Sequence, residues 1–354
     1  MAGEVFSTVG LYHVCMLRTV SAIALLPGLA GLSLAASLNQ NSPTGSAGLL
    51  LIDKIGREVR FLDPATFKEI SSVEVGVAPH DFAISPDHKF AYIPVYGDGI
   101  YGRNTNPGHT IAVVDLVNRK VDQIIDIAPY QAPHGIQIDS TGSAIYVTCD
   151  LSRKVLVIDT KSRTIKATID TEGTGHWIAV LPDASKLYVA NKNDKLFVSV
   201  LDLKTNKMIG RVPAPNGTQG IVASPDGKTV IVGDNSEPKL LVIDAKTDKV
   251  VDTVALENST KGVYKPYFSP DGSKLIVCSE NPPLVHILDA KNLHGKQTVL
   301  TVGKDPMGFA VSGDGRTLLV ANHGDGTVSV VDLKEGKITS TFKAGTGIET
   351  LAYY

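Results

Sequence analysis

The stretch that decides the fold is QAPHGIQIDSTGSAIYVTCD, residues 131–150, because close variants of it recur along the chain. Each variant has a short apolar run, a polar turn such as Ser-Pro-Asp-Gly and a second apolar run, except the last, which meets the end of the sequence. With residues 131–150 there are seven copies, and the other six begin at Ala78, Thr174, Thr218, Val263, Pro306 and Ile348.

A second marker, an apolar run that ends in aspartate, confirms the period of the repeat. The aspartates are separated by intervals of 52, 44, 43, 42, 45 and 43 residues. A period near 43 with four short β-branched runs per copy, and no amphipathic helical pattern between them, is typical of a β-propeller blade. The sequence therefore predicts an all-β, seven-bladed propeller with four-stranded antiparallel blades. The marker aspartates are Asp63, Asp115, Asp159, Asp202, Asp244, Asp289 and Asp332.

The two ends of the repeat region complete each other. Three apolar runs at 49–53, 58–63 and 69–75 have no inner strand before them, whereas residues 348–354 supply one inner strand with nothing after it. Together they make one blade, so we expect the ring to close by pairing the N-terminal strands with the C-terminal strand, which leaves no free sheet edge there. Residues 49–354 are predicted to form a single propeller domain.

The first 36 residues are predicted to be an N-terminal extension plus a secretory signal peptide. Residues 16–36 contain one positive charge, a short apolar segment and Ser33-Leu-Ala35, whose small residues suit a signal-peptidase cleavage site. The apolar body is too short and too interrupted by Gly and Pro for a good membrane span, although an uncleaved anchor is the alternative. We expect a flexible lead-in at 37–48, and a secreted or periplasmic protein with no stable membrane span after signal removal. Met16 is an alternative to Met1 as the start of translation.

Composition excludes some functions and limits others. A formal net charge of -2 gives no basic field, so nucleic acid is not an expected partner. Of the three cysteines, Cys149 and Cys278 fall in blades that a propeller places far apart, and we expect buried thiols instead of a disulfide. Neither a G-x-S-x-G elbow nor an H-E-x-x-H motif occurs in the sequence, which disfavours the common hydrolase nucleophiles.

The interval of 52 residues contains an insertion at 95–109 that is rich in glycine and polar residues. We expect an ordered surface loop there instead of another strand. Its G-x-G-x-x-G pattern at 97–102 opens no predicted helix, so it does not indicate a dinucleotide site. Tyr101, Arg103 and His109 are candidate ligand contacts at the rim, and loop packing is the alternative.

The repeats resemble the YVTN family of β-propeller repeat proteins. The best matches are DASKLYVAN at 183–191 and GRTLLVAN at 315–322, and the resemblance covers residues 49–354. It implies a seven-bladed propeller like those of secreted proteins, surface-layer proteins and lactonases. Related propellers also include cofactor-bearing dehydrogenase and reductase subunits, so the resemblance implies no single activity and no catalytic residue.

Alignment of the seven inner strands predicts a ring of residues at one mouth of the central channel. Three neighbouring imidazoles beside a carboxylate suit a divalent metal ion, which would be zinc in a tetrahedral site or copper, iron or manganese in a more open one. The alternative is that each histidine only hydrogen-bonds channel water or the next blade, and was copied with the repeat. The aligned residues are His80, His134, His176, Gln219, Tyr264, Met307 and Glu349.

The predicted function is metal-dependent hydrolytic or lytic chemistry on a small, polar, carbonyl-containing molecule. His80, His134 and His176 are the predicted metal ligands. Glu349 is the fourth ligand or the general base, while Tyr264 (as a catalytic residue) and Gln219 orient the substrate. His323, on a loop of the same face, is a further candidate for substrate contact.

Two alternatives remain open at this point. One is a copper or iron redox enzyme at the same residues, and the other is a non-catalytic surface or periplasmic module that binds a protein partner. The remaining histidines are weaker candidates, since His88 and His294 lie in predicted turns on the far side and His286 lies in an apolar strand.

Overall fold

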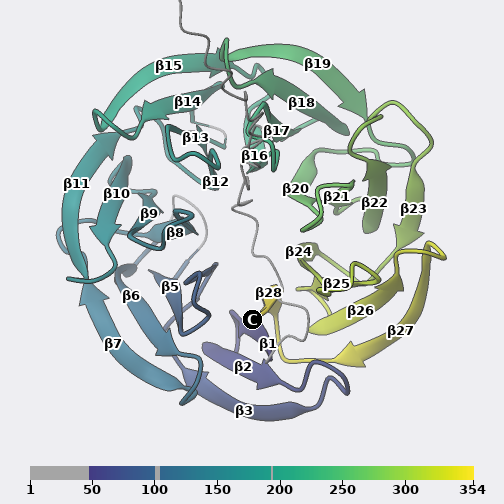
Figure 1. Ribbon diagram of the computed structural model, residues 1–354, viewed down its shortest axis with the longest axis horizontal. Helices are drawn as coiled ribbons and strands as arrows, with labels where there is room; N and C mark the ends of the chain where they lie inside the picture. The colour runs from purple at the N-terminus through teal and green to yellow at the C-terminus, as the bar shows by residue number, and fades with distance from the viewer. Residues whose placement is uncertain (1–47, 100–103, 193) are drawn as a thin grey trace, which may run out of the picture. The chain divides into compact units, whose positions relative to one another are not determined.

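The computed structural model describes residues 48–99, 104–192 and 194–354. These residues form seven four-stranded antiparallel sheets arranged as a ring, which confirms the predicted fold (Figure 1). The predicted extension and signal peptide at 1–36, all but the last residue of the lead-in, Cys15, Tyr101 and Arg103 lie outside the described residues. In the described ranges no helix is long and apolar enough to cross a bilayer.

The blades are numbered from the first complete repeat, and their strands are given from the channel outwards. Blade 1 contains β4 (Ala83–Ile84), β5 (Phe90–Gly97), β6 (Pro107–Asp115) and β7 (Lys120–Asp126). Blade 2 contains β8 (Pro133–Ile138), β9 (Ala144–Cys149), β10 (Lys154–Asp159) and β11 (Thr164–Asp170). Blade 3 contains β12 (Ile178–Val180), β13 (Lys186–Ala190), β14 (Phe197–Asp202) and β15 (Lys207–Pro213). Blade 4 contains β16 (Thr218–Ala223), β17 (Thr229–Asp234), β18 (Lys239–Asp244) and β19 (Lys249–Ala255).

The remaining three blades follow the same order. Blade 5 contains β20 (Val263–Phe268), β21 (Lys274–Ser279), β22 (Leu284–Asp289) and β23 (Thr298–Thr301). Blade 6 contains β24 (Pro306–Val311), β25 (Thr317–Asn322), β26 (Thr327–Asp332) and β27 (Lys337–Lys343). Blade 7 contains β28 (Ile348–Tyr353), β1 (Leu49–Asp53), β2 (Glu58–Leu62) and β3 (Glu69–Glu74).

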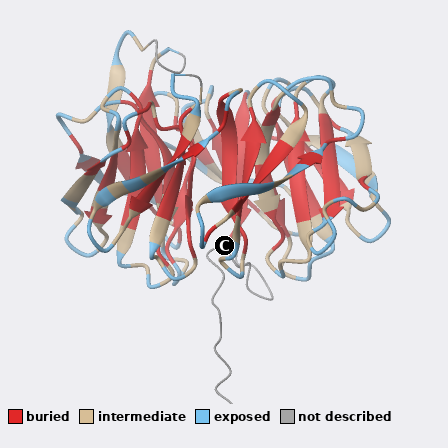
Figure 2. Ribbon diagram, turned by 90° about the horizontal axis from the view of Figure 1, so that it is seen from above, coloured by how far each residue is buried: buried red, intermediate tan, exposed pale blue. Residues whose placement is uncertain are grey.

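Burial decreases from the channel to the perimeter of the ring. The inner three strands of each blade are mostly buried, whereas the outermost strand alternates between exposed and partly buried residues (Figure 2). Apolar side chains from facing sheets pack between the blades, as in the cluster that joins Phe61 of blade 7 to Ile93 of blade 1. Burying a large apolar side chain contributes about 1.5–3 kcal/mol, so these layers between the blades supply most of the driving force for folding.

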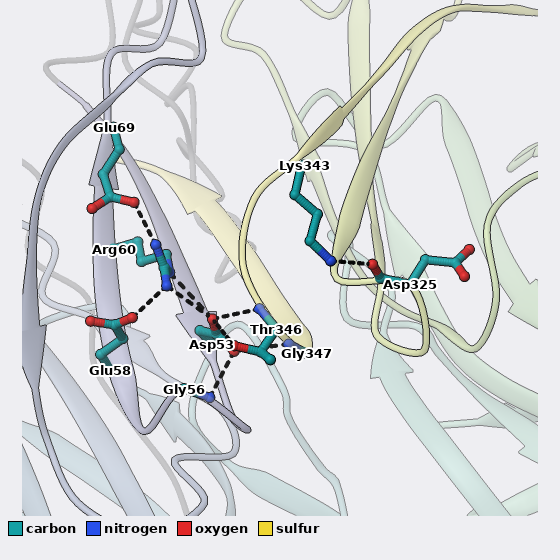
Figure 3. Close-up of polar contacts among 9 residues, drawn as sticks. All are labelled: Asp53, Gly56, Glu58, Arg60, Glu69, Asp325, Lys343, Thr346 and Gly347. Carbon is teal, nitrogen blue, oxygen red and sulfur yellow. Dashed lines mark hydrogen bonds and ion pairs between the residues drawn. The ribbon is translucent and has the colours of Figure 1, made fainter.

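The ring closes as predicted, through antiparallel pairing of β28 with β1. The side chain of Asp53, the last residue of β1, adds to this closure. Its buried carboxylate accepts three backbone N–H bonds, from Gly56 at 2.9 Å, Thr346 at 2.8 Å and Gly347 at 2.9 Å (Figure 3). Arg60 forms an ion pair with the same carboxylate at 3.3 Å. Burial alone would raise the pKa of Asp53, but these hydrogen bonds and the guanidinium lower it overall.

The marker aspartates have the structural role expected of them. Asp63 accepts the backbone N–H of Thr66 at 2.7 Å, and Asp244 accepts that of Thr247 at 2.7 Å. Each therefore stabilises the turn that leads to the outermost strand of its blade. Cys149 and Cys278 are buried free thiols, also as expected, and burial raises the pKa of both.

The prediction for the insertion at 95–109 was only partly right. Strands β5 and β6 extend into it from both sides and still pair at Gly97 and Pro107, so the two ends of the expected loop belong to a longer hairpin. The extension has a physical cause, because Gly97 has a φ of +89° and allows Gly108 to approach its backbone closely.

Candidate functional site

The three predicted histidines lie together at one mouth of the channel. His134 belongs to β8, whereas His80 lies three residues before the short inner strand β4 and His176 two residues before β12. The ring centroids of His80 and His134 are 3.8 Å apart, and those of His134 and His176 are 3.9 Å apart. All three side chains are buried, so the repeat brings residues from three consecutive blades into one stack.

Burial keeps these imidazoles neutral. Desolvation lowers the pKa of each histidine well below the usual 6.5. For His80 and His176 the next largest cause is the neighbouring His134, and the ammonium groups of nearby lysines act in the same direction. Neutral imidazoles can accept a proton or bind a metal ion, whereas imidazolium groups can do neither.

Glu349, in β28, is the acidic centre of the mouth. Its Oε1 lies 3.3 Å from Nδ1 of His80, and its Oε2 lies 3.1 Å from Nδ1 of His323. Although burial raises the pKa of Glu349, the nearby Lys54 and His323 lower it overall, so the carboxylate is ionised at neutral pH. The structure thus brings His323, predicted only as a substrate contact, to the carboxylate itself.

Lys54, which we did not predict, completes this group. Its ammonium lies 2.9 Å from Nε2 of His80 and 3.6 Å from Oε2 of Glu349. An ammonium only donates, so Nε2 of His80 is the acceptor and the proton of the neutral ring is on Nδ1, which lies near Glu349 without a hydrogen bond to it. His80 is therefore held in one tautomer between a cation and an anion.

Lys54 belongs to a second set of residues, each of which lies at the end of the second strand of its blade or within two residues after it. Tyr96 of this set donates to Oδ2 of Asp150 at 3.0 Å, and burial raises the pKa of Asp150 well above its usual value. Burial lowers the pKa of Lys192, which also belongs to the set. The second set consists of Lys54, Tyr96, Asp150, Lys192, Asn235, Glu280 and His323.

The seven aligned residues of the inner strands are called the first ring. Gln219 and Tyr264 are its members in blades 4 and 5, which follow the three blades that carry the histidines. Gln219 is buried, and its Oε1 has no hydrogen-bond partner among the residues that the structure describes. The pKa of Tyr264 is raised by burial and by Glu280 of the second set. The Tyr264 ring packs edge-on against Trp177, with centroids 6.2 Å apart.

Beneath the first ring, small and large residues alternate around the channel. Gly135, Gly220 and Gly308 follow the aligned residue in blades 2, 4 and 6, and a Cβ on Gly135 would lie 2.5 Å from the carbonyl oxygen of His176. These glycines let the inner strands approach one another closely. The corresponding larger residues are Asp81, Trp177, Lys265 and Thr350.

The larger residues line a channel cavity of about 110 Å³ whose walls are otherwise mostly apolar. The Lys265 ammonium lies 3.7 Å from Asp81 and 5.3 Å from the centre of the Trp177 ring. The indole Nε1 of Trp177 is buried and has no hydrogen-bond partner within the described ranges. A small cavity therefore lies next to the mouth, and its lining includes one ammonium group and one indole N–H donor.

Other predicted residues lie elsewhere. His109 pairs with Asp126 on the surface at 3.0 Å, on the extended hairpin of blade 1. His294 pairs with Asp252 at 2.8 Å, also on the surface. His286 is a core residue, as expected: it contacts Ser259 at 3.0 Å and Gln297 at 3.2 Å, and burial lowers its pKa to about 4.

The fit of this mouth to a metal ion is mixed. Neutral imidazoles and an ionised carboxylate are suitable ligands. In residues 48–99, 104–192 and 194–354, however, no three His, Cys, Asp or Glu side chains are arranged so that they could hold an ion as they stand. The ammonium of Lys54 lies between two of the donors, and Lys192 and Lys265 add positive charge that opposes a second cation.

Comparison with known proteins supports the repeat family. The sequence model of the YNCE-like beta-propeller family matches residues 164–271. The uncharacterized protein YncE of Salmonella typhi is 26% identical over 133 residues, and the YncE of Salmonella typhimurium matches equally well. These alignments cover 36% of this chain and 36% of the length of either relative.

Among solved structures, a chain of Kuenenia stuttgartiensis hydrazine synthase is similar in fold. It aligns with a TM-score of 0.68 and 19% identity, over 77% of this chain and 89% of that chain. At this identity the likeness extends to the propeller architecture alone.

Proposed function

Since the chain is a seven-bladed β-propeller of the YVTN-repeat type, we propose that it binds a small anion with a carbonyl or carboxylate group at the mouth of its channel. One observation carries the proposal. The ammonium groups of Lys54, Lys192 and Lys265 lie close enough to the buried imidazoles to lower the pKa of both His134 and His176. Three cations around a neutral stack attract an anion into a site from which water is largely excluded.

The neighbouring carboxyl groups do not cancel this field completely. Glu349 is ionised, but burial raises the pKa of Asp81 and of Asp150, so both give up their protons less readily than an exposed aspartate. The binding roles follow from position. Lys192 and Lys265 hold the anionic group of the ligand, and Gln219 and Tyr264 orient its remaining polar atoms.

The same geometry supports hydrolytic or lytic chemistry on the bound molecule. Once a ligand anion attracts the Lys54 ammonium, Nε2 of His80 is available to accept a proton, and Glu349 lies beside the opposite nitrogen of the ring. A histidine oriented by a carboxylate in this way is a suitable general base. His134 and His176 lie beside it and can contact a carbonyl oxygen of the ligand.

Metal-dependent hydrolytic or lytic chemistry is the second candidate function. Three neutral imidazoles in consecutive blades favour it, with His80, His134 and His176 as ligands and Glu349 as the fourth ligand or general base. A bound zinc, copper, iron or manganese ion would polarise a carbonyl and lower the pKa of water. Elemental analysis of the purified protein tests this candidate, and a visible absorption band would indicate the copper or iron redox alternative.

We further propose that the propeller works outside the cytoplasm, in the periplasm or as a secreted protein. The signal-like sequence at 16–36 supports this location. Cell fractionation together with the intact mass of the mature protein tests it. A mature chain that begins near residue 37 is expected, and a cytoplasmic protein that retains residues 16–36 would contradict the proposal.

Thermal unfolding with acetate, pyruvate, oxalate, malonate and citrate, followed by calorimetric titration of the best of these probes, tests the anion site. A ligand that binds only the native state raises the melting temperature. We expect Lys192→Met to weaken binding at least about tenfold, the equivalent of about 1.4 kcal/mol. Lys228→Met is the matched control, because Lys228 is exposed on a distant turn. Equal binding by both variants, or no binding of any probe by the wild type, would refute the proposal.

A further inference from the structure

The channel cavity beside the mouth has aromatic walls. Its lining residues come from all seven blades, so it is a section of the central channel itself. Four of them are aromatic, namely Phe82, Trp177, Tyr267 and Phe309, and most of the others are aliphatic. The rings of Tyr267 and Phe309 lie with their centroids 6.1 Å apart. Aromatic side chains attract a further ring through offset or edge-on contacts, so these walls favour an aromatic group in the cavity.

Lys265 connects this cavity with the mouth. It directly follows Tyr264 of the first ring and also lines the cavity. Its ammonium lies 3.7 Å from Oδ1 of Asp81 and 5.3 Å from the centre of the Trp177 ring. The 3.7 Å contact is longer than a hydrogen bond, and an ammonium has three donors, so Lys265 can donate to a ligand. A carboxylate that binds there places the rest of its molecule beside Trp177.

The size of the cavity limits the group that it can hold. An apolar cavity of about 150 Å³ holds a benzene molecule in another protein. The channel cavity, at about 110 Å³, is somewhat smaller. A single six-membered ring would therefore fill it, provided that the charged group of the ligand stays outside, next to Lys265.

We propose that this cavity binds the ring of an aromatic monocarboxylate, and that Lys265 binds its carboxylate. The inference rests on the proposed anion site and names the chemical class of its ligand. Burying the ring removes apolar surface from water, which acetate and the other small acids cannot do. The ring and the carboxylate thus bind to different parts of one continuous site.

Calorimetric titration of the wild type with acetate and with phenylacetate tests the inference. The two acids have the same charge and differ by one ring, and we expect phenylacetate to bind at least about tenfold more tightly. Trp177 is the single tryptophan of the chain, so its fluorescence reports on the cavity. Phenylacetate should change this emission with the same dissociation constant that calorimetry gives.

A variant tests the role of Lys265. Lys265→Met keeps an unbranched side chain and removes the charge, and it should bind phenylacetate at least about tenfold more weakly than the wild type. Lys228→Met is the matched control, because Lys228 is exposed on a distant turn, and it should bind like the wild type. Circular dichroism establishes that both variants are folded. Equal phenylacetate affinity in Lys265→Met and the wild type would contradict the assigned role of Lys265.

A crystal structure of the wild type with phenylacetate locates the ring without any substitution. We expect the ring in the channel cavity beside Trp177. A ring on the outer surface, or equal affinities for acetate and phenylacetate, would overturn the inference and leave the anion site in place. Binding of neither acid would instead refute the anion site, and this inference with it.

Discussion

The backbone N–H of Thr346 donates to Oδ2 of Asp53 at 2.8 Å, although the two residues are 293 positions apart in the chain. Closure of the ring and assembly of the mouth are therefore one event. Lys54 directly follows Asp53, and Glu349 lies three residues after Thr346, so the bond that joins the two ends also sets a cation beside an anion at the candidate site.

Loss of the Asp53 carboxylate should open the ring. Asp53→Ala leaves three backbone donors without their acceptor, whereas Arg60 keeps its ion pairs with Glu58 and Glu69. We expect the free energy of unfolding to fall by about 3–5 kcal/mol, because each buried donor left without a partner costs about 1–3 kcal/mol. Urea denaturation measures this loss. Asp63→Ala is the control: Asp63 is exposed and only caps its own turn, so its loss should be clearly smaller. Equal losses would contradict the proposed role of Asp53 in closure.

The fold should lose stability as the pH falls from 7 to 5. His286 is buried in its neutral form with a pKa of about 4, against 6.5 for an exposed histidine. The unfolded chain therefore binds protons that the native state does not. The stability due to neutral His286 is complete above pH 6.5 and declines as the pH falls toward 4, by roughly 2 kcal/mol at pH 5.

Denaturation of the His286→Leu variant at pH 7 and pH 5 isolates this effect. The variant should be less stable at pH 7, because Ser259 and Gln297 lose their partner, but its stability should change less with pH than that of the wild type. His294→Gln, a substitution at a surface ion pair, should keep the wild-type dependence. An unchanged pH dependence in His286→Leu would be evidence against the argument.

Close approach of blades 2 and 3 depends on Gly135. In Gly135→Ala the new Cβ would lie 2.5 Å from the carbonyl oxygen of His176, so the strands must separate and the stack of His134 and His176 must widen. We expect a loss of about 1–3 kcal/mol in unfolding free energy, together with weaker binding of the best carboxylate probe.

The matched control for this prediction is Gly210→Ala. There the new Cβ would make an ordinary contact, 3.6 Å from Val200. Melting curves and calorimetry measure both effects. Two variants of equal stability and equal affinity would mean that tight strand packing does not shape the mouth.

Repeat alignment predicted the first ring because a propeller brings equivalent positions together, and His80, His134 and His176 meet as expected. Lys54 and Lys192 also occupy equivalent positions, close to the ends of the second strands of their blades. Their sequence context gives no sign of this role, because lysines in polar turns are usually solvated.

The contacts between individual pairs of side chains could not be predicted from the alignment. An alignment places His323 and Glu349 on one face, but the 3.1 Å contact between them depends on side-chain directions and on the curvature of the loop. The sequence shows that Gly135 and Trp177 occupy equivalent positions in neighbouring blades. Their effect on the spacing of the strands could not be predicted, because it depends on the distance between neighbouring inner strands.

The central claim is that lysines from distant parts of the chain make the channel mouth an anion site, and anomalous diffraction from bromide-soaked crystals tests it most directly. We predict a bromide peak at the mouth between Lys54, Lys192 and Lys265 that disappears in crystals of Lys192→Met. Peaks confined to the outer surface, with none at the mouth of the wild type, would contradict the account.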